Sequence, residues 1–589
     1  MKQRILAVAL SLGLIGLAIP APVRANDGLG EGRSIKHVLL ISIDGMHAVD
    51  YENCVASKSC PNLAALGRTG VHYTRTTTSR PSDSFPGLMA IVTGGSPRTV
   101  GAFYDVAYDR VLAPPKTTTG NGLPGGACNL NQINGTQTEY EEGNEIDQSK
   151  LNGGFAGYST IDGGVKSIDP DKLIRDPFNN CKPVYSWNFV RTNTIFGVIH
   201  AAGGYTAWSD KHAGYASVSG PTGTDQPSNV DDYYSPEVNS LQIVLPGLKT
   251  AALIPEASFD CGTLVPNGDD WTTDFDAIKC YDQLKVNAVV NWINGKTHLA
   301  TASAPVPVIF GMNFQAVSVG QKLIEPKSAV RTDANSGGYE DAQGTPRPKM
   351  LAQIQFVDAA IGQMVAALKH EGLFDSTTII ITAKHGQSPI DPNRFFPIPG
   401  HSGNNGTPPS GIIPANLFPA VYNDPNNGLG LAEDDISQIW LADSSRTGDA
   451  VTALENSATA FGQGQIYYGA SLNGLFNPPG VPDHPGPCCK LREGGDPRSP
   501  DIVVIPSVGV VYTGNLKKQS EHGGFAWDDT NVMLLVSNPN LESRTIYSFV
   551  ETAQVAPTIL KILGLDPNAL DAVRQEGTPV LPYLFGPGE

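Results

Sequence analysis

The chain has 589 residues, with 40 Lys or Arg, 57 Asp or Glu, and a formal net charge of -17. An acidic chain of this kind is a poor partner for nucleic acid or for an anionic membrane surface, so we expect neither. Its length would allow several domains, but the pattern described below favours one large domain over residues 35–589.

The first residues have the pattern of an export signal. Lys2 and Arg4 precede an apolar run at residues 5–19, and Val23-Arg24-Ala25 has the small-x-small form of a cleavage site. About 15 apolar residues fall short of the roughly 20 that span a bilayer. We therefore predict a signal peptide at residues 1–25, no later membrane span, and a periplasmic or secreted location. A retained membrane anchor is the alternative.

The chain contains eight cysteines. In an exported protein, cysteines favour disulfides over metal ligands. Eight cysteines allow 105 pairings, so proximity along the chain is the only guide. It suggests the pairs Cys54–Cys60, Cys128–Cys181, Cys261–Cys280 and Cys488–Cys489.

Apolar runs of strand length alternate with helical patterns. The predicted strands are residues 37–43, 205–208, 305–314, 377–382, 502–505 and 532–536, and the clearest predicted helices are residues 61–66 and 348–368. Such alternation is typical of an α/β fold with a mostly parallel central sheet and helices on both faces. Residues 106–185 and 388–500 are rich in Gly, Pro and Asn, and we expect them to be loop-rich insertions into that domain.

Distinctive polar residues follow the predicted strands. Asp44 follows the first, Asn313 closes the run at 305–314, and Lys384-His385 follows the run at 377–382. A single Asp in this position is often a helix N-cap. However, ligands of open α/β sheets bind at the carboxyl ends of parallel strands, so the set together predicts a site.

Ser84 precedes Phe85-Pro86 at the start of a predicted helix. Proline suits the first turn of a helix, so Ser84 could simply be an N-cap. The alternative is a nucleophile, because the positive end of a helix stabilises an alkoxide and the phosphate that it attacks.

Six short motifs, in order, resemble the alkaline phosphatase superfamily, in its type I phosphodiesterase/nucleotide pyrophosphatase branch. They are Asp44-Gly45, Ser84-Phe85-Pro86 with Val92-Thr93-Gly94, Val357-Asp358 to Gly362, His385-Gly386, His522-Gly523-Gly524, and Ala556 to Leu560. The resemblance implies an alkaline-phosphatase-like core and a divalent metal cofactor, zinc in this family, as one or two ions. It implies that Asp44, Ser84 and His385 bind one ion and His522 the other.

The chain departs from the family pattern at the metal site. Lys384 stands where the family has Asp, and Asn313 and Val317 align with two further ligand positions. Asp105 occupies the place of a phosphate-binding Asn. Replacing a carboxylate by an ammonium about 5 Å from a dication removes on the order of 10 kcal/mol of attraction. Either Lys384 takes over the electrostatic role of a metal ion, or the site keeps one cation held by other ligands.

We therefore predict a hydrolase of small phosphate esters, of the phosphodiester or nucleotide pyrophosphate type. Ser84 and Lys384 are its predicted catalytic residues, and Asp105 and Asn313 are its predicted substrate-binding residues. We also expect a salt bridge from Lys384 to Asp44 or Asp105. The alternatives are an inactive binding protein on the same fold and a sulfatase, although Leu88 replaces the Arg of the sulfatase motif. The sequence contains no indication of oligomeric state.

Overall fold

The computed structural model describes residues 35–585 except for 118–126, 132–134, 141–142, 151–163, 241–248, 252–260, 262–269, 326–331, 333, 399–408, 420–431, 461, 477–495 and 513–517. The predicted signal peptide at residues 1–25 and the predicted pair Cys488–Cys489 lie outside the described residues. The other three predicted disulfides, Cys54–Cys60, Cys128–Cys181 and Cys261–Cys280, are confirmed.

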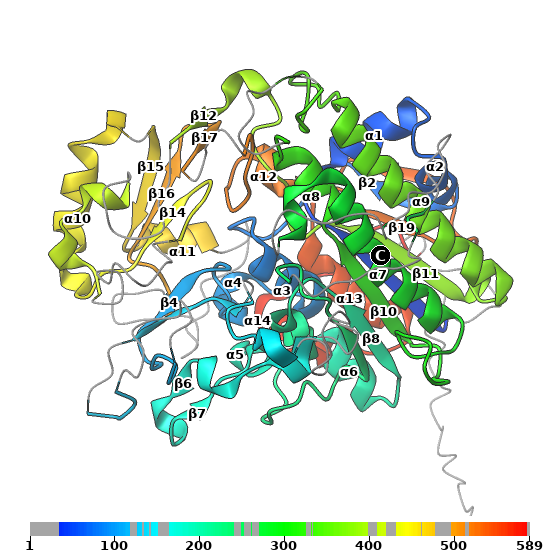
Figure 1. The fold of residues 1–589 in the computed structure, drawn as a ribbon, viewed down its shortest axis with the longest axis horizontal. Helices are drawn as coiled ribbons and strands as arrows, with labels where there is room; N and C mark the ends of the chain where they lie inside the picture. The colour runs from blue at the N-terminus through cyan, green and yellow to red at the C-terminus, as the bar shows by residue number, and fades with distance from the viewer. Residues whose placement is uncertain are drawn as a thin grey trace, which may run out of the picture.

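An eight-stranded sheet forms the centre of the molecule (Figure 1). Its strands, in spatial order, are β20 (Arg544–Ile546), β2 (Gly70–Tyr73), β19 (Leu535–Ser537), β11 (Thr377–Thr382), β1 (His37–Ile43), β10 (Ile309–Phe314), β8 (Thr206–Ser209) and β9 (Asp232–Tyr234). Only β19 runs antiparallel to its neighbours. The prediction of a mostly parallel sheet is therefore confirmed.

The central strand β1 shows why the sheet is covered on both faces. Leu39, Ile41 and Ile43 belong to one hydrophobic cluster, whereas Val38 and Leu40 belong to a second cluster on the opposite face. A strand that is apolar on both sides is the pattern of a buried parallel sheet.

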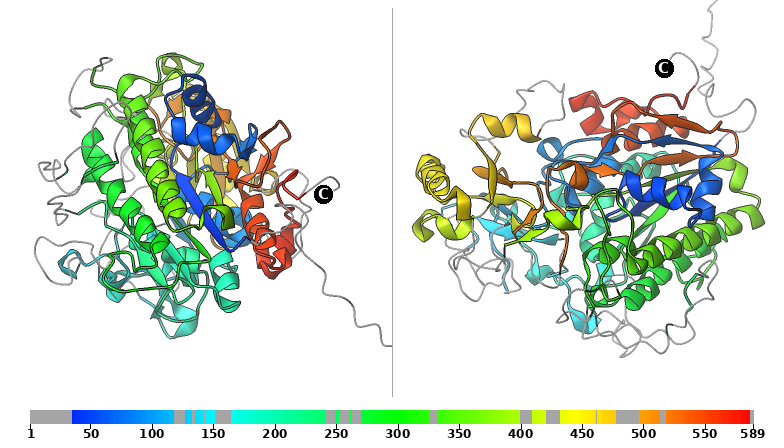
Figure 2. Two further views of the ribbon diagram at one scale, coloured as in Figure 1. Left: turned by 90° about the vertical axis from the view of Figure 1, so that its right-hand side faces the viewer. Right: turned by 90° about the horizontal axis from the view of Figure 1, so that it is seen from above.

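Helices cover both faces, as the view from above shows (Figure 2). Residues of the first cluster come from α1 (Ala48–Ala56), α2 (Pro61–Gly67), α7 (Phe275–Ile293), α8 (Ala316–Lys322) and α9 (Pro348–His370). Residues of the second cluster come from α3 (Ser84–Thr93), α4 (Pro97–Val100), α5 (Ser186–Phe189), α6 (Ile195–Ala201), α13 (Val555–Ile562) and α14 (Asp571–Glu576).

Helix α9 concerns the expectation that no membrane span follows residues 1–25. It has 23 residues and a mean hydropathy of 1.4, so by length and composition it could cross a membrane. The core helix of a soluble protein passes the same test. Here 56% of its most apolar window is buried inside the protein, and the helix packs against α2, α7 and α8. Its apolar character is therefore explained by the core.

The second predicted insertion contains more regular structure than expected. A separate four-stranded sheet is built from β13 (Ala432–Glu433), β14 (Ser437–Ile439), β16 (Ile502–Pro506) and β15 (Gln463–Tyr468), beside α10 (Thr447–Glu455) and α11 (Ser471–Phe476). It has its own hydrophobic cluster around the buried Trp440. Residues 502–505 are thus a strand, as predicted, but the expectation that they join the central sheet was wrong.

The run at residues 532–536 is divided between two sheets. Its start belongs to β18 (Asn531–Val532), in a small sheet with β3 (Thr76–Thr77) and β21 (Val550–Glu551), and its end belongs to β19. The remaining elements are short: β4 (Ala107–Asp109), β5 (Thr136–Thr138), β6 (Arg175–Asp176), β7 (Lys182–Pro183), β12 (Phe396–Pro397), β17 (Val510–Val511) and α12 (Trp527–Thr530).

Candidate active site

Four neighbouring parallel strands deliver polar residues to one edge of the sheet. In the spatial order β11, β1, β10 and β8, these residues are Lys384 with His385, Asp44, Asn313 and Asp210. All five side chains are buried. The predicted convergence of strand-end residues is therefore present.

Ser84 is the first residue of α3, and Asp83 before it is the N-cap, whose carboxylate accepts a hydrogen bond of 2.9 Å from the Ser84 amide. The cap is thus one residue earlier than predicted. Gly87, in the first turn, lets α3 approach the backbone of Lys384, two residues after β11. A Cβ atom at this position would lie 2.1 Å from the Lys384 carbonyl oxygen.

The Ser84 hydroxyl lies against His385. Its Oγ is 3.2 Å from His385 Nε2, and His385 Nδ1 is 3.0 Å from the carbonyl oxygen of Gly386. Because a carbonyl can only accept, Nδ1 carries the hydrogen and Nε2 is left to accept from Ser84. Burial, reinforced by repulsion from His522, holds the pKa of His385 well below its ordinary value. The imidazole is therefore neutral and able to take a proton.

Asp44 is held as a carboxylate beside this pair. Its Oδ2 accepts hydrogen bonds from Asn313 Nδ2 at 3.0 Å and Gln315 Nε2 at 2.5 Å. Its Oδ1, which has no hydrogen-bond partner among the described residues, is 3.9 Å from His385 Nε2. Burial alone would raise the pKa of Asp44, but the charge of Lys384, with smaller contributions from Lys211 and the hydrogen bond of Asn313, outweighs burial and holds that pKa below its ordinary value.

Lys384 pairs with Asp210, so the prediction of a salt bridge to Asp44 or Asp105 was wrong. Its Nζ is 3.0 Å from Asp210 Oδ1 and 3.6 Å from the centre of the Tyr215 ring. Both side chains of the pair are fully buried. The physical reason is the strand order, because β8 and β11 end at the same edge of the sheet and this brings the buried carboxylate of Asp210 within reach of Lys384.

His522 stands next to His385, with ring centres 4.1 Å apart. Its Nδ1 is 2.9 Å from Asp83 Oδ1, although their orientation does not make a hydrogen bond. Asp83 Oδ2 accepts from the amide of Asp105 at 2.7 Å, and Asp105 Oδ1 accepts from the Phe85 amide at 2.6 Å. Asp105 thus accepts a hydrogen bond from a backbone amide at the start of α3. Substrate binding by Asp105 stays a prediction.

The donor atoms do not fit the two-ion centre that the resemblance implies. Among the described residues, no three His, Cys, Asp or Glu side chains are placed to hold a metal ion. Asp44, His385 and the Ser84 hydroxyl meet at one position, where Lys384 replaces the carboxylate of the family. At the second ion position, His522 lacks the two further ligands that the family pattern implies. Asn313 stands at one of these positions and its amide donates to Asp44, and Val317 stands at the other and is a core residue of α8. Metal binding by Asp44, Ser84, His385 and His522 stays a prediction.

Three residues of the site are absent from the predicted set. Asp210 follows the predicted strand at residues 205–208, a position that could reach the site but favoured a structural salt bridge, and Gln315 directly follows β10, so its strand-end position was a usable signal. Tyr215 has no such signal, because it lies in a short 3-10 helix after β8 and its place over Lys384 depends on the fold.

Comparison with known proteins identifies the family and the fold of the chain. A family model described as "type I phosphodiesterase / nucleotide pyrophosphatase" matches residues 38–126 and 332–529. These two segments contain Asp44, Ser84, Lys384, His385 and His522. A search of curated protein sequences finds no match.

Three of the solved structures with a similar fold are ectonucleotide pyrophosphatase/phosphodiesterase structures. Mouse ectonucleotide pyrophosphatase/phosphodiesterase 5 aligns with a TM-score of 0.50 and 14% identity, covering 90% of this chain and 96% of its own. An inactive variant of the mouse protein in complex with AMP gives the same values. The human protein aligns with a TM-score of 0.50 and 13% identity, covering 90% of this chain and 95% of its own. The family match and the shared fold place this chain in the type I phosphodiesterase/nucleotide pyrophosphatase branch of the alkaline phosphatase superfamily, a branch of phosphoester hydrolases.

Proposed function

We propose that this protein is an exported phosphodiesterase or nucleotide pyrophosphatase that acts through Ser84 as its nucleophile. The observation that carries the proposal is the 3.2 Å contact between Ser84 Oγ and His385 Nε2 at the start of α3. A hydroxyl beside a neutral imidazole is the arrangement of an activated nucleophile.

In the first step, Ser84 Oγ attacks phosphorus while its proton moves to His385 Nε2. The bond from phosphorus to the leaving oxygen breaks, and that oxygen departs with the electron pair and takes up a proton. Water then hydrolyses the phosphoseryl intermediate and regenerates Ser84. Asp44 Oδ1, 3.9 Å from Nε2, stabilises the imidazolium that forms.

Lys384 supplies a fixed positive charge in this proposal. The family generally works with divalent metal ions, but the donor atoms here do not fit a two-ion centre. Lys384 is fully buried and makes the largest of the neighbouring charge contributions that lower the pKa of Asp44. It therefore keeps Asp44 ionised. The partial positive charge at the start of α3 favours a phosphate beside Ser84.

Export and a nucleotide-like substrate complete the proposal. The three disulfides fit an oxidising compartment, periplasmic or extracellular. The predicted signal peptide at residues 1–25 fits the same location. AMP bound to the mouse relative suggests a small nucleotide ester as substrate.

The test is the Ser84→Ala variant, assayed on a panel of aryl phosphodiesters and aryl phosphomonoesters. We expect its turnover to vanish. Ser79→Ala, which changes a nearby serine whose hydroxyl bonds only the Pro81 carbonyl among the described residues, should keep full activity. Mass spectrometry of quenched wild-type protein should find the phosphoryl adduct on Ser84. A wild-type protein inactive on the whole panel would favour the binding-protein alternative.

A further inference from the structure

A second buried ion pair lies in α7, next to the strand end that carries Asn313. Lys285 Nζ is 3.0 Å from Asp282 Oδ1, and both side chains are fully buried. The two residues are three apart, so they lie on the same side of the helix, and α7 packs against β10 and α8. Burying two charges is costly unless further hydrogen bonds satisfy them. The other contacts of the pair therefore show what it holds in place.

The carboxylate of Asp282 caps the start of α8. Gln315 is the N-cap residue of α8, but its own side chain makes no capping hydrogen bond. Instead, Asp282 Oδ2 accepts from the backbone amides of Gln315 and Ala316, each at 2.8 Å. The first amides of a helix have no partner within the helix, so a cap of this kind stabilises it. The Gln315 side chain is left to donate to Asp44 Oδ2 at 2.5 Å.

The ammonium of Lys285 holds the residue before this turn. Its Nζ donates to the backbone oxygen of Asn313 at 2.5 Å and lies 4.7 Å from the centre of the Tyr281 ring. The side-chain amide of Asn313 donates to Asp44 Oδ2 at 3.0 Å. The ion pair thus holds, through their backbones, both residues whose side chains bind Asp44.

We propose that Asp282 and Lys285 are positioning residues of the active site. By fixing the backbone of the turn after β10, the pair keeps two side-chain amides on Asp44 Oδ2 and leaves Asp44 Oδ1 turned toward His385. This Oδ1 atom has no hydrogen-bond partner among the described residues and lies 3.9 Å from His385 Nε2. The inference rests on the proposed function, because it takes Asp44 as the group that stabilises the imidazolium.

The experiment compares two double variants, each of which removes both charges. Asp282→Leu/Lys285→Met leaves an apolar pair, whereas Asp282→Asn/Lys285→Gln keeps groups that accept from and donate to the turn. Neither variant leaves an unpaired buried charge, so both should fold, which urea denaturation checks. In the apolar variant, kcat for an aryl phosphodiester should fall at least about tenfold with KM unchanged, because Asp44 is no longer held for the transition state. The polar variant should keep most of the wild-type kcat.

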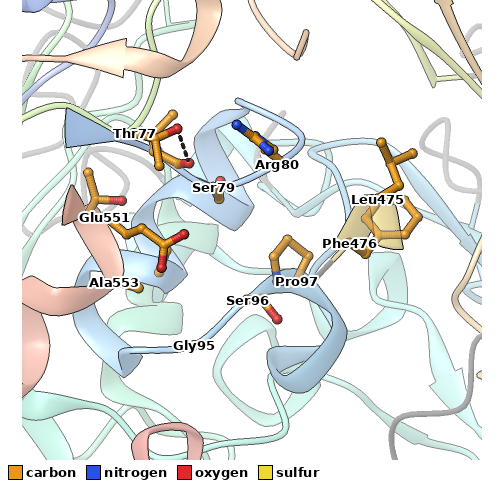
Figure 3. A pocket seen from close by; sticks show the side chains of 13 residues that line it. Thr77, Ser79, Arg80, Gly95, Ser96, Pro97, Leu475, Phe476, Glu551 and Ala553 are labelled. Atoms are coloured by element: carbon orange, nitrogen blue, oxygen red, sulfur yellow. Dashed lines mark hydrogen bonds between the residues drawn. The ribbon is translucent and has the colours of Figure 1, made fainter. Parts of the chain in front are cut away.

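Two controls separate positioning from a general loss of stability. Asp276 and Lys279 form an ion pair of the same spacing in α7, 2.7 Å apart and with Asp276 47% exposed. Asp276→Leu/Lys279→Met should keep the wild-type kcat. Glu551 lines a different, small cavity together with Arg80 and Ser96 (Figure 3). Glu551→Gln removes a carboxyl at that distant place and should also keep the wild-type kcat.

Hydrogen exchange of residues 313–322 adds a readout that does not depend on turnover. Backbone amides of this segment should exchange faster in the apolar variant than in the wild type, and at the wild-type rate in the polar variant. Equal exchange in the wild type and the apolar variant would overturn the proposal. So would an unchanged kcat in the apolar variant, or an equal loss of kcat in both double variants or in the Asp276/Lys279 control.

Failure of the proposed function is a separate outcome. It shows as a wild-type protein without turnover on the whole panel of aryl phosphoesters. The exchange rates would still show whether Asp282 and Lys285 hold the turn.

Discussion

The ammonium of Lys384 and the carboxylate of Asp210 lie 3.0 Å apart, and both side chains are fully buried. Lys384 follows β11 and Asp210 follows β8, so the pair reaches across the ends of β1 and β10. The Tyr215 ring beneath the ammonium adds a cation–π contact. The site therefore contains a buried ion pair at the edge of the sheet where β11, β1, β10 and β8 end.

Removing the positive partner of this pair should be costly. In Lys384→Met, Asp210 becomes a buried charge without its lysine, and we expect the free energy of unfolding to fall by about 3–5 kcal/mol. The double variant Lys384→Met/Asp210→Asn removes both charges and should recover most of that loss. Urea denaturation of the three proteins measures the difference. A Lys384→Met protein as stable as the wild type would show that Lys384 and Asp210 do not behave as a buried ion pair.

The same two variants separate stability from catalysis. Because Lys384 supplies the fixed charge, both should lose at least about 100-fold in kcat/KM for aryl phosphodiesters, which is the scale for removing one electrostatic group from an active site. Activity recovered in the double variant, together with stability, would mean that Lys384 has only a structural role.

Gly87→Ala should disturb the contact between Ser84 and His385. The added methyl would lie 2.1 Å from the backbone oxygen of Lys384, so α3 must move away from β11. We expect a loss of about 1–3 kcal/mol in unfolding free energy and a lower kcat. Gly448→Ala is the control, because no atom of the described part of the chain lies within 4 Å of the methyl added to this glycine of α10. Equal unfolding free energies and equal kcat values for Gly87→Ala and Gly448→Ala would show that stability and activity do not require the close approach of α3.

Glu551 should make stability depend on pH near neutrality. Burial raises its pKa from an ordinary value of 4.5 to about 7. The folded protein therefore holds this proton more tightly than the unfolded chain, and its stabilising effect is complete below about pH 4.5 and lost as the pH rises to about 7. In Glu551→Gln the decline in unfolding free energy between these pH values should be shallower than in the wild type. Identical slopes for the two proteins would contradict the assignment.

The sequence predicted the positions of individual strands better than it predicted which sheet each strand joins. The runs at residues 37–43 and 377–382 are β1 and β11, because a strand buried on both faces has a continuous apolar sequence. The run at 502–505 has the same character but joins the smaller sheet as β16. A short apolar strand contains nothing that specifies which sheet will receive it.

The partner of Lys384 was unpredictable for a related reason. The sequence shows that Lys384, Asp44 and Asp210 follow strands, but the spatial order β11, β1, β10, β8 exists only in the folded sheet. The disulfides were easier to predict, because Cys54 and Cys60 lie six residues apart and Cys261 and Cys280 lie 19 apart.

The most direct test of a lysine-assisted Ser84 site is to measure bound metal and turnover on the same sample. Wild-type protein would be dialysed against a chelator, its divalent metal content determined by plasma mass spectrometry, and its kcat for an aryl phosphodiester compared with untreated protein. We predict unchanged kcat in protein that retains far less than one ion per chain. Turnover that disappears on chelation and returns with added zinc would contradict the role given to Lys384.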